Sequence, residues 1–96
     1  MQIDYSKLPH HMQDGMKLYI EEGIEPGSFM SAVLCNDLME ACNRADHVNI
    51  ERLRDYASFL YNHAPRSCYG SREIFSKWIG HGGLNGLMKA NTANSR

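Results

Sequence analysis

The stretch from Ser28 to Asp46 constrains the fold most, because its apolar residues recur on almost every side of a helix. Those residues are Phe29, Met30, Ala32, Val33, Leu34, Cys35, Leu38, Met39, Ala41, Cys42 and Ala45. A helix that is apolar nearly all round is normally enclosed by neighbouring segments. The pattern therefore predicts one continuous, buried central helix over residues 28–46, around which the rest of the chain packs.

Two charged residues interrupt this apolar surface. At about 3.6 residues per turn, Asp37 and Arg44 project into the apolar arc, while Asn36 and Glu40 lie at its edge. Glu40 and Arg44 have the i,i+4 spacing of a helical ion pair. An acid on an apolar face must be paired, lose its charge or contact a polar group. Two interpretations of Asp37 and Arg44 stay open: a structural ion network between helices, or a recessed polar binding site.

The remaining segments predict four short helices around the central one. We expect them at residues 9–22, 49–64, 71–79 and 84–88. The residues that mark helix starts and ends are Pro9, Gly23, Ser28, Pro65 and Ser71, the two serines as N-caps. No stretch alternates apolar and polar residues for long enough to form a strand. The predicted fold is all-α: a compact bundle of four short helices around a central buried helix, with a frayed C-terminal tail.

Length and charge limit the possible organisation. The 96 residues suit one small domain, which we expect at 8–90, between a lead-in at 1–7 and a flexible tail at 91–96. A core of this size gains stability from self-association, so we expect a homo-oligomer. The net charge of −1 argues against a general nucleic-acid binder. Residues 1–46 carry three basic and eight acidic residues, and residues 47–96 carry seven and three, so the halves have opposite charge.

The cysteines, histidines and apolar runs argue against several classes of protein. Cys35, Cys42 and Cys68 are an odd number without CxxC spacing, which predicts free thiols in a reducing cytoplasm. The five histidines lack the spacing of a metal-ligand set, so we expect neither a metal nor another cofactor. We find no secretion leader and no apolar run near the roughly 20 residues that span a bilayer. These features predict a cytoplasmic protein without a membrane partner.

No arrangement of residues predicts catalysis. A nucleophile needs a neighbouring base, and the nearest pair in the sequence is Cys68 with His63 five residues before it. Asp37 and Glu40 lie beside Arg44, which suits ion pairing better than acid–base chemistry. We therefore expect the protein not to be an enzyme.

The loop around Pro65 carries residues that suit binding. Tyr61 and Asn62 precede this proline and Tyr69 follows it. Aromatic and amide groups around a loop can hold a planar ligand or a partner protein, or they can simply pin the connection to the domain. The helix starts at Ser28 and Ser71 are anion sites in principle, although ordinary capping explains both serines.

Four segments resemble a group of small helical proteins that recur in tailed phages and prophages. They are LPHHMQDGMKLYIEEGIEPGSF, AVLCNDLMEACNRAD, FLYNHAPRSCYGS and WIGHGGL, and the resemblance covers roughly residues 8–87. The function of that group is mostly unassigned, so the resemblance implies a phage setting and no reaction. The group has tryptophan at the position of Tyr69, which leaves this loop aromatic here but changes its bulk.

These observations predict a non-catalytic phage or prophage accessory protein that binds a host target in the host cytoplasm. Counter-defence is one such role, either by blocking a protein complex or by sequestering a small anionic ligand such as a nucleotide. The residues predicted to bind are Tyr19, Ser28, Asn36, Asp37, Arg44, Asn62, Tyr69 and Ser71. The alternative is a small DNA-binding transcriptional regulator with a helix-turn-helix motif in its second and third helices. Acidic Glu51 and Asp55 on the third helix argue against this alternative.

Overall fold

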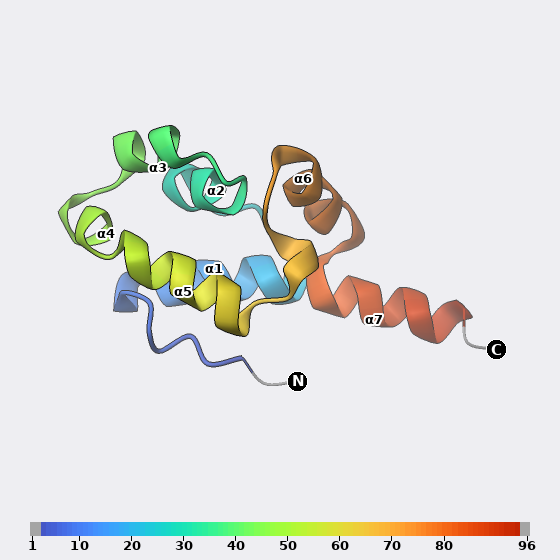
Figure 1. Ribbon diagram of the computed structural model, residues 1–96. Coiled ribbons are helices and arrows are strands. Elements are labelled where there is room, and N and C mark those ends of the chain that lie inside the picture. The colour runs from blue at the N-terminus through green and yellow to red at the C-terminus, as the bar shows by residue number, and fades with distance from the viewer. Residues whose placement is uncertain (1–2, 95–96) are drawn as a thin grey trace.

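Figure 1 shows the computed structural model, in which short helices follow one another along the chain. The structure describes residues 3–94 and, for 90–94, the backbone alone. Within this part the elements are α1 (His10–Glu22), α2 (Ser28–Leu34), α3 (Leu38–Arg44), α4 (His47–Glu51), α5 (Leu53–His63), the 3-10 turn η1 (Arg66–Cys68), α6 (Arg72–His81) and α7 (Gly83–Asn94). None of the described residues forms a strand, which confirms the predicted all-α class. The predicted arrangement of four helices around a central one is not what the structure has.

The expected central helix is broken in its middle. Helix α2 ends at Leu34, and Asn36 adopts a left-handed conformation with φ +62°. Asp37 then caps a new helix, because its side chain accepts a hydrogen bond of 3.2 Å from the backbone N–H of Glu40. Asparagine tolerates the left-handed region and aspartate is a strong N-cap, so together they favour a turn over a continuous helix. The prediction of one helix over 28–46 is wrong for this local reason.

The break leaves α3, in the second half of residues 28–46, largely outside the core. Helix α2 buries Phe29, Met30, Ala32 and Leu34, whereas α3 buries only Ala41. Asp37 and Arg44 are both exposed, so the prediction of an embedded acid–base pair is wrong. The predicted Glu40–Arg44 ion pair is confirmed, with 3.0 Å between Arg44 Nε and Glu40 Oε2, but it lies at the surface. An exposed pair of this kind contributes less than about 1 kcal/mol.

The core lies between α1, α2, α5 and α6. Buried aromatic and aliphatic side chains from all four helices form one cluster with Leu8 and Cys68. Tyr19 lies at its centre: its hydroxyl donates to the carbonyl of Cys68 at 2.7 Å, and its own carbonyl accepts from Trp78 Nε1 at 3.0 Å. Among the described residues, no buried side-chain nitrogen or oxygen lacks a hydrogen-bond partner. The buried polar side-chain groups of the described core are therefore all paired.

Glycines allow α1 and the α6–α7 connection to meet at backbone distance. Gly23 ends α1 in the left-handed conformation predicted for it, with φ +69°. A Cβ atom on Gly83 would lie 2.5 Å from the backbone nitrogen of Gly23, which is closer than side-chain atoms approach. Only glycine fits at both positions. This contact fixes the base of α7, which extends away from the body of the molecule (Figure 1).

The expected helix over residues 49–64 is also divided. Asp46 caps α4 by accepting from Asn49 N–H at 2.8 Å, so the helix begins at His47, two residues earlier than expected. Asn49 is instead buried, and its side chain accepts from the hydroxyl of Tyr56 at 2.8 Å. The chain bends at Arg52 between α4 and α5.

Structural elements extend into both of the predicted end segments. Residues 3–8 are held against the domain, since Tyr5 donates to Glu21 at 3.0 Å and its ring lies 5.5 Å from that of Phe59. Helix α7 continues to Asn94, where we predicted a frayed tail. The rest of the predicted lead-in, residues 1–2, and of the tail, residues 95–96, lies outside the described part.

Candidate functional site

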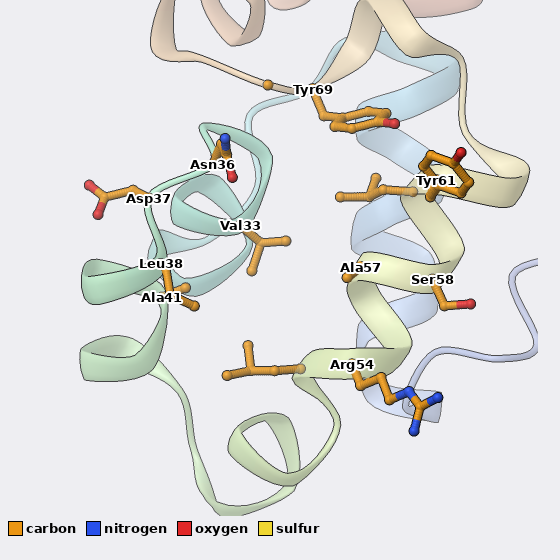
Figure 2. A pocket seen from close by; sticks show the side chains of 13 residues that line it. Val33, Asn36, Asp37, Leu38, Ala41, Arg54, Ala57, Ser58, Tyr61 and Tyr69 are labelled. Atoms are coloured by element: carbon orange, nitrogen blue, oxygen red, sulfur yellow. The ribbon is translucent and has the colours of Figure 1, made fainter.

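An open groove lies between α2–α3 and α5 (Figure 2). Its volume is about 690 Å³, which is within the range of protein binding pockets. The groove is lined by Val33, Asn36, Asp37, Leu38, Ala41, Leu53, Arg54, Ala57, Ser58, Leu60, Tyr61, Tyr69 and Gly70. We call this feature the groove throughout.

Helix α5 forms one wall of the groove because it has two different faces. Tyr56, Phe59 and Leu60 turn into the core. Ala57 and Tyr61 follow Leu53 at intervals of four, so they form a ridge along the side of the helix that faces the groove. Tyr61 is 80% exposed, an unusual amount for so large a side chain.

The opposite wall comes from the α2–α3 turn. Val33 and Ala41 face the space in front of α5, and Leu38 lies beside them (Figure 2). Leu38 is 66% exposed because the turn at Asn36 carries the first residue of α3 away from the core. The Asp37 carboxylate points away from α5, as expected of a group that caps α3 (Figure 2). The break in the predicted central helix therefore creates this wall.

The loop after η1 closes one end of the groove. The backbone N–H of Gly70 donates to the carbonyl of Leu34 at 2.9 Å, which fixes the loop to α2. Tyr69 is half-buried, packs against the core and projects across this end of the groove (Figure 2). Arg54 lies at the opposite end (Figure 2). The groove thus has an aromatic, amide-bearing end, whereas the Arg54 side chain at the other end projects away from the α2–α3 wall (Figure 2).

The structure brings three of the predicted binding residues together in the groove. These are Asn36, Asp37 and Tyr69. Tyr19 is fully buried in the core, and Ser71 caps α6 by accepting from Ile74 N–H at 3.2 Å, as predicted. Asn62 is exposed on α5 and donates to the Ser58 carbonyl at 2.9 Å.

The other two predicted residues, Ser28 and Arg44, border a second hollow of about 330 Å³. Gly27 occupies the cap position of α2, so Ser28 is the first helical residue and does not cap. The charged residues of this hollow are Glu25, Asp37, Glu40, Arg44 and Arg72, three acids and two bases. Arg44 is already engaged by Glu40. This balance does not favour a small anion.

Sequence reasoning missed most of the groove wall. The missed residues are Val33, Leu38, Ala41, Leu53, Arg54, Ala57, Ser58, Leu60 and Gly70. The repeat of Leu53, Ala57 and Tyr61 at intervals of four was a signal for the α5 wall. The α2–α3 wall depends on the turn at Asn36, and the Asn-Asp pair at 36–37 was the only signal for it.

The nucleophile candidates offer no activated group. Cys68 is fully buried, and burial raises the pKa of its thiol to about 12, so it stays protonated at neutral pH. Burial also raises the pKa of the Cys35 thiol. No group of three or more histidine, cysteine or acidic residues in the described part of the chain could hold a metal ion.

Arg52, a basic residue at the start of α5 that the DNA-binding alternative could use, has partners within the fold. Arg52 pairs with Asp55 through Nε and donates to the carbonyl of Lys7 at 2.7 Å. Its guanidinium therefore braces the lead-in against α5 and is not free for a phosphate contact.

Comparison with known proteins yielded no match among family models, curated proteins or solved structures. No helix in residues 3–94 is long and apolar enough to cross a lipid bilayer.

Proposed function

We propose that the chain is a non-catalytic accessory protein of a phage or prophage that binds a host protein through the groove. One observation carries this proposal: large apolar side chains stay exposed around a groove in a molecule whose described core pairs all of its buried polar side-chain groups. Leu38 and Tyr61 are the two largest of them. Among the interactions of the described residues, neither contributes a hydrogen bond that holds the fold together.

The energetic reason is the cost of leaving these groups in water. Removing apolar surface from water contributes roughly 25 cal/mol per Å², so a partner that covers Leu38, Leu53 and Tyr61 gains affinity directly. Tyrosine is also enriched among the residues that dominate protein interfaces. Asn36 and Ser58 at the rim supply polar groups that can fix the register of a partner.

A protein partner fits the groove better than a small anion does. Among the described residues that line it, only Asp37 and Arg54 are charged, so it offers no excess positive charge. Apolar side chains make up most of its walls, and a protein segment with apolar anchors matches such walls. In the phage setting that the resemblance implies, occupying a host protein would block its assembly with others, which is one route to counter-defence.

The proposal is tested by capture from host lysate with a matched pair of variants. Leu38→Glu places a charge in the groove wall, whereas Met39→Glu places the same charge one residue away on a side chain that does not line the groove. Both residues are exposed in the first turn of α3, where an acid is favourable, so both variants should fold.

We expect Leu38→Glu to reduce recovery of a specific host protein at least tenfold, measured by quantitative mass spectrometry against the unmodified chain. Met39→Glu should leave recovery within twofold. Equal recovery by all three proteins would contradict the groove as the binding site. The small-molecule fraction of the same samples identifies a nucleotide ligand if that alternative is correct.

A further inference from the structure

The exposed face of α5 carries two small residues between two large ones. Arg54, Ala57, Ser58 and Tyr61 are all exposed on it, while Tyr56 and Phe59 hold the opposite face in the core. Small residues stand in the middle of this face and one large residue stands at each end. Such a face can receive another helix closely at its centre.

The spacing of the two large residues is symmetric about the centre. Arg54 and Tyr61 each lie three and a half positions from the point between Ala57 and Ser58, or about 5 Å along the helix axis at 1.5 Å per residue. A two-fold axis through that point makes the two helices antiparallel and places Arg54 of one helix opposite Tyr61 of the other. One surface then fits itself, as an isologous dimer interface requires.

We propose that two copies of this chain pair through α5, antiparallel, with Tyr61 of each copy packed over the Arg54 guanidinium of the other. An arginine on the face of a tyrosine ring contributes about 0.5–1 kcal/mol at exposed sites, and the pair forms twice. Among the side chains that the structure describes, the Arg54 guanidinium has no acidic partner within ion-pair distance. It is therefore available for this contact.

Repulsion between the two Arg54 side chains does not prevent this pairing. The two Arg54 groups of the dimer are offset by about 10 Å along the helix axes, which is comparable with the screening length at physiological ionic strength. Their repulsion is therefore weak, and the apolar contact of the exposed Ala57 and Tyr61 side chains opposes it.

The second copy also completes the groove. Arg54 stands at the open end of the groove, opposite Tyr69 (Figure 2). In the dimer, Tyr61 of the second copy lies over that end and becomes part of its lining. Because the pairing uses Tyr61, a host protein would contact the groove of the dimer through Leu38 and Leu53; the pairing itself does not depend on the host-binding proposal.

Cysteine cross-linking tests the position of the axis. In a Cys42→Ser background, which removes the exposed native thiol, Ser58→Cys places a thiol beside the two-fold axis. Under mild oxidation we expect covalent dimer to form at least ten times faster than with Ser76→Cys, an exposed position on α6. Equal rates would overturn the proposed axis.

An exchange of residues tests the contact itself. By analytical ultracentrifugation, Arg54→Glu and Tyr61→Lys should each raise the dimer dissociation constant at least tenfold. The double variant should return it to within threefold of the original, because the introduced glutamate and lysine would face each other across the axis as an ion pair. Failure of rescue, or a monomer at every concentration of the unmodified chain, would overturn the proposal. The two proposals can fail independently. If Leu38→Glu no longer captures the host protein while Ser58→Cys still forms the cross-linked dimer, host binding and pairing are separate properties.

Discussion

The buried hydrogen bonds of Tyr19 with Cys68 and Trp78, which we call the joint, lie in the core. The joint and the groove around Tyr61 use the same residue type in opposite ways. Tyr19 is fully buried: its ring stacks on Phe75 with centroids 5.4 Å apart, and its hydroxyl donates to a backbone carbonyl. Tyr61 leaves most of its surface in water, beside small residues. Both are tyrosines on helices, at positions that a helical pattern predicts equally well.

The difference shows that the fold is held by one part of the molecule and that the groove is an addition to it. In the joint, Trp78 and Tyr19 connect three chain segments through buried hydrogen bonds. In the groove, the walls carry exposed apolar groups on helices whose other faces are already packed. Substitutions in the two regions should therefore separate stability from binding.

The largest expected effect comes from truncation in the joint. Trp78→Ala should lower the free energy of unfolding by about 3–5 kcal/mol, because it leaves a cavity and removes the donor to the Tyr19 carbonyl. Met39→Ala, at a side chain that is 81% exposed, should change it by less than about 0.5 kcal/mol. Urea titration measures both, and similar losses would erase the contrast between core and surface.

The next effect tests the close approach of α1 and α7. Gly83→Ala should cost about 1–3 kcal/mol or more, because the residue has φ +69° and an added Cβ would meet the backbone of Gly23. Gly80→Ala lies inside α6 with open space around it and should stabilise the protein by about 0.5–1 kcal/mol. Thermal unfolding distinguishes the two signs. A stabilising Gly83→Ala would rule out the contact.

The features that the sequence could predict are those that neighbouring residues decide. The left-handed end at Gly23 and the cap at Ser71 depend on adjacent positions alone, so local reasoning found both. The all-α class follows from helical periodicity for the same reason. The Glu40–Arg44 pair was predictable because it needs only one helical turn.

The groove was not predictable in the same way, because two local preferences compete in the segment that forms its α2–α3 wall. Periodicity favoured one helix through 28–46, whereas Asn36 and Asp37 favoured a turn, and the turn prevailed where the second half had no core to join. Asn49 shows the same limit, since its partner Tyr56 is provided by the next helix. Which tyrosine is buried is set by packing between segments distant in sequence.

A smaller effect concerns the hydroxyl groups of the two tyrosines. Tyr19→Phe should cost about 1–2 kcal/mol, because it removes a buried hydrogen bond to Cys68 and leaves that carbonyl unpaired. Tyr61→Phe should be neutral within about 0.5 kcal/mol. Chemical denaturation of both variants makes the comparison. Equal effects would show that Tyr61 has a structural partner.

A gradual effect is a dependence of stability on alkaline pH that comes from the buried Cys68. The folded pKa of Cys68 is raised to about 12 from the ordinary 9.0, so the unfolded thiol ionises first as the pH rises. The Cys68 contribution is full below pH 9, declines by up to about 1.4 kcal/mol per pH unit above it and is lost by pH 12. Urea titrations between pH 8 and about 10.5 measure the decline, and Cys68→Ala should make it shallower. An unchanged slope would contradict the burial of this thiol.

The most direct test of the division between core and groove is the free energy of unfolding of Leu38→Glu, measured by urea titration beside the unmodified chain. We predict a change of less than about 0.5 kcal/mol, because Leu38 lies outside the core and an acid is favourable in the first turn of α3. A loss of more than about 2 kcal/mol would show that the groove wall belongs to the core, and the proposed binding surface would then be part of what holds the fold together.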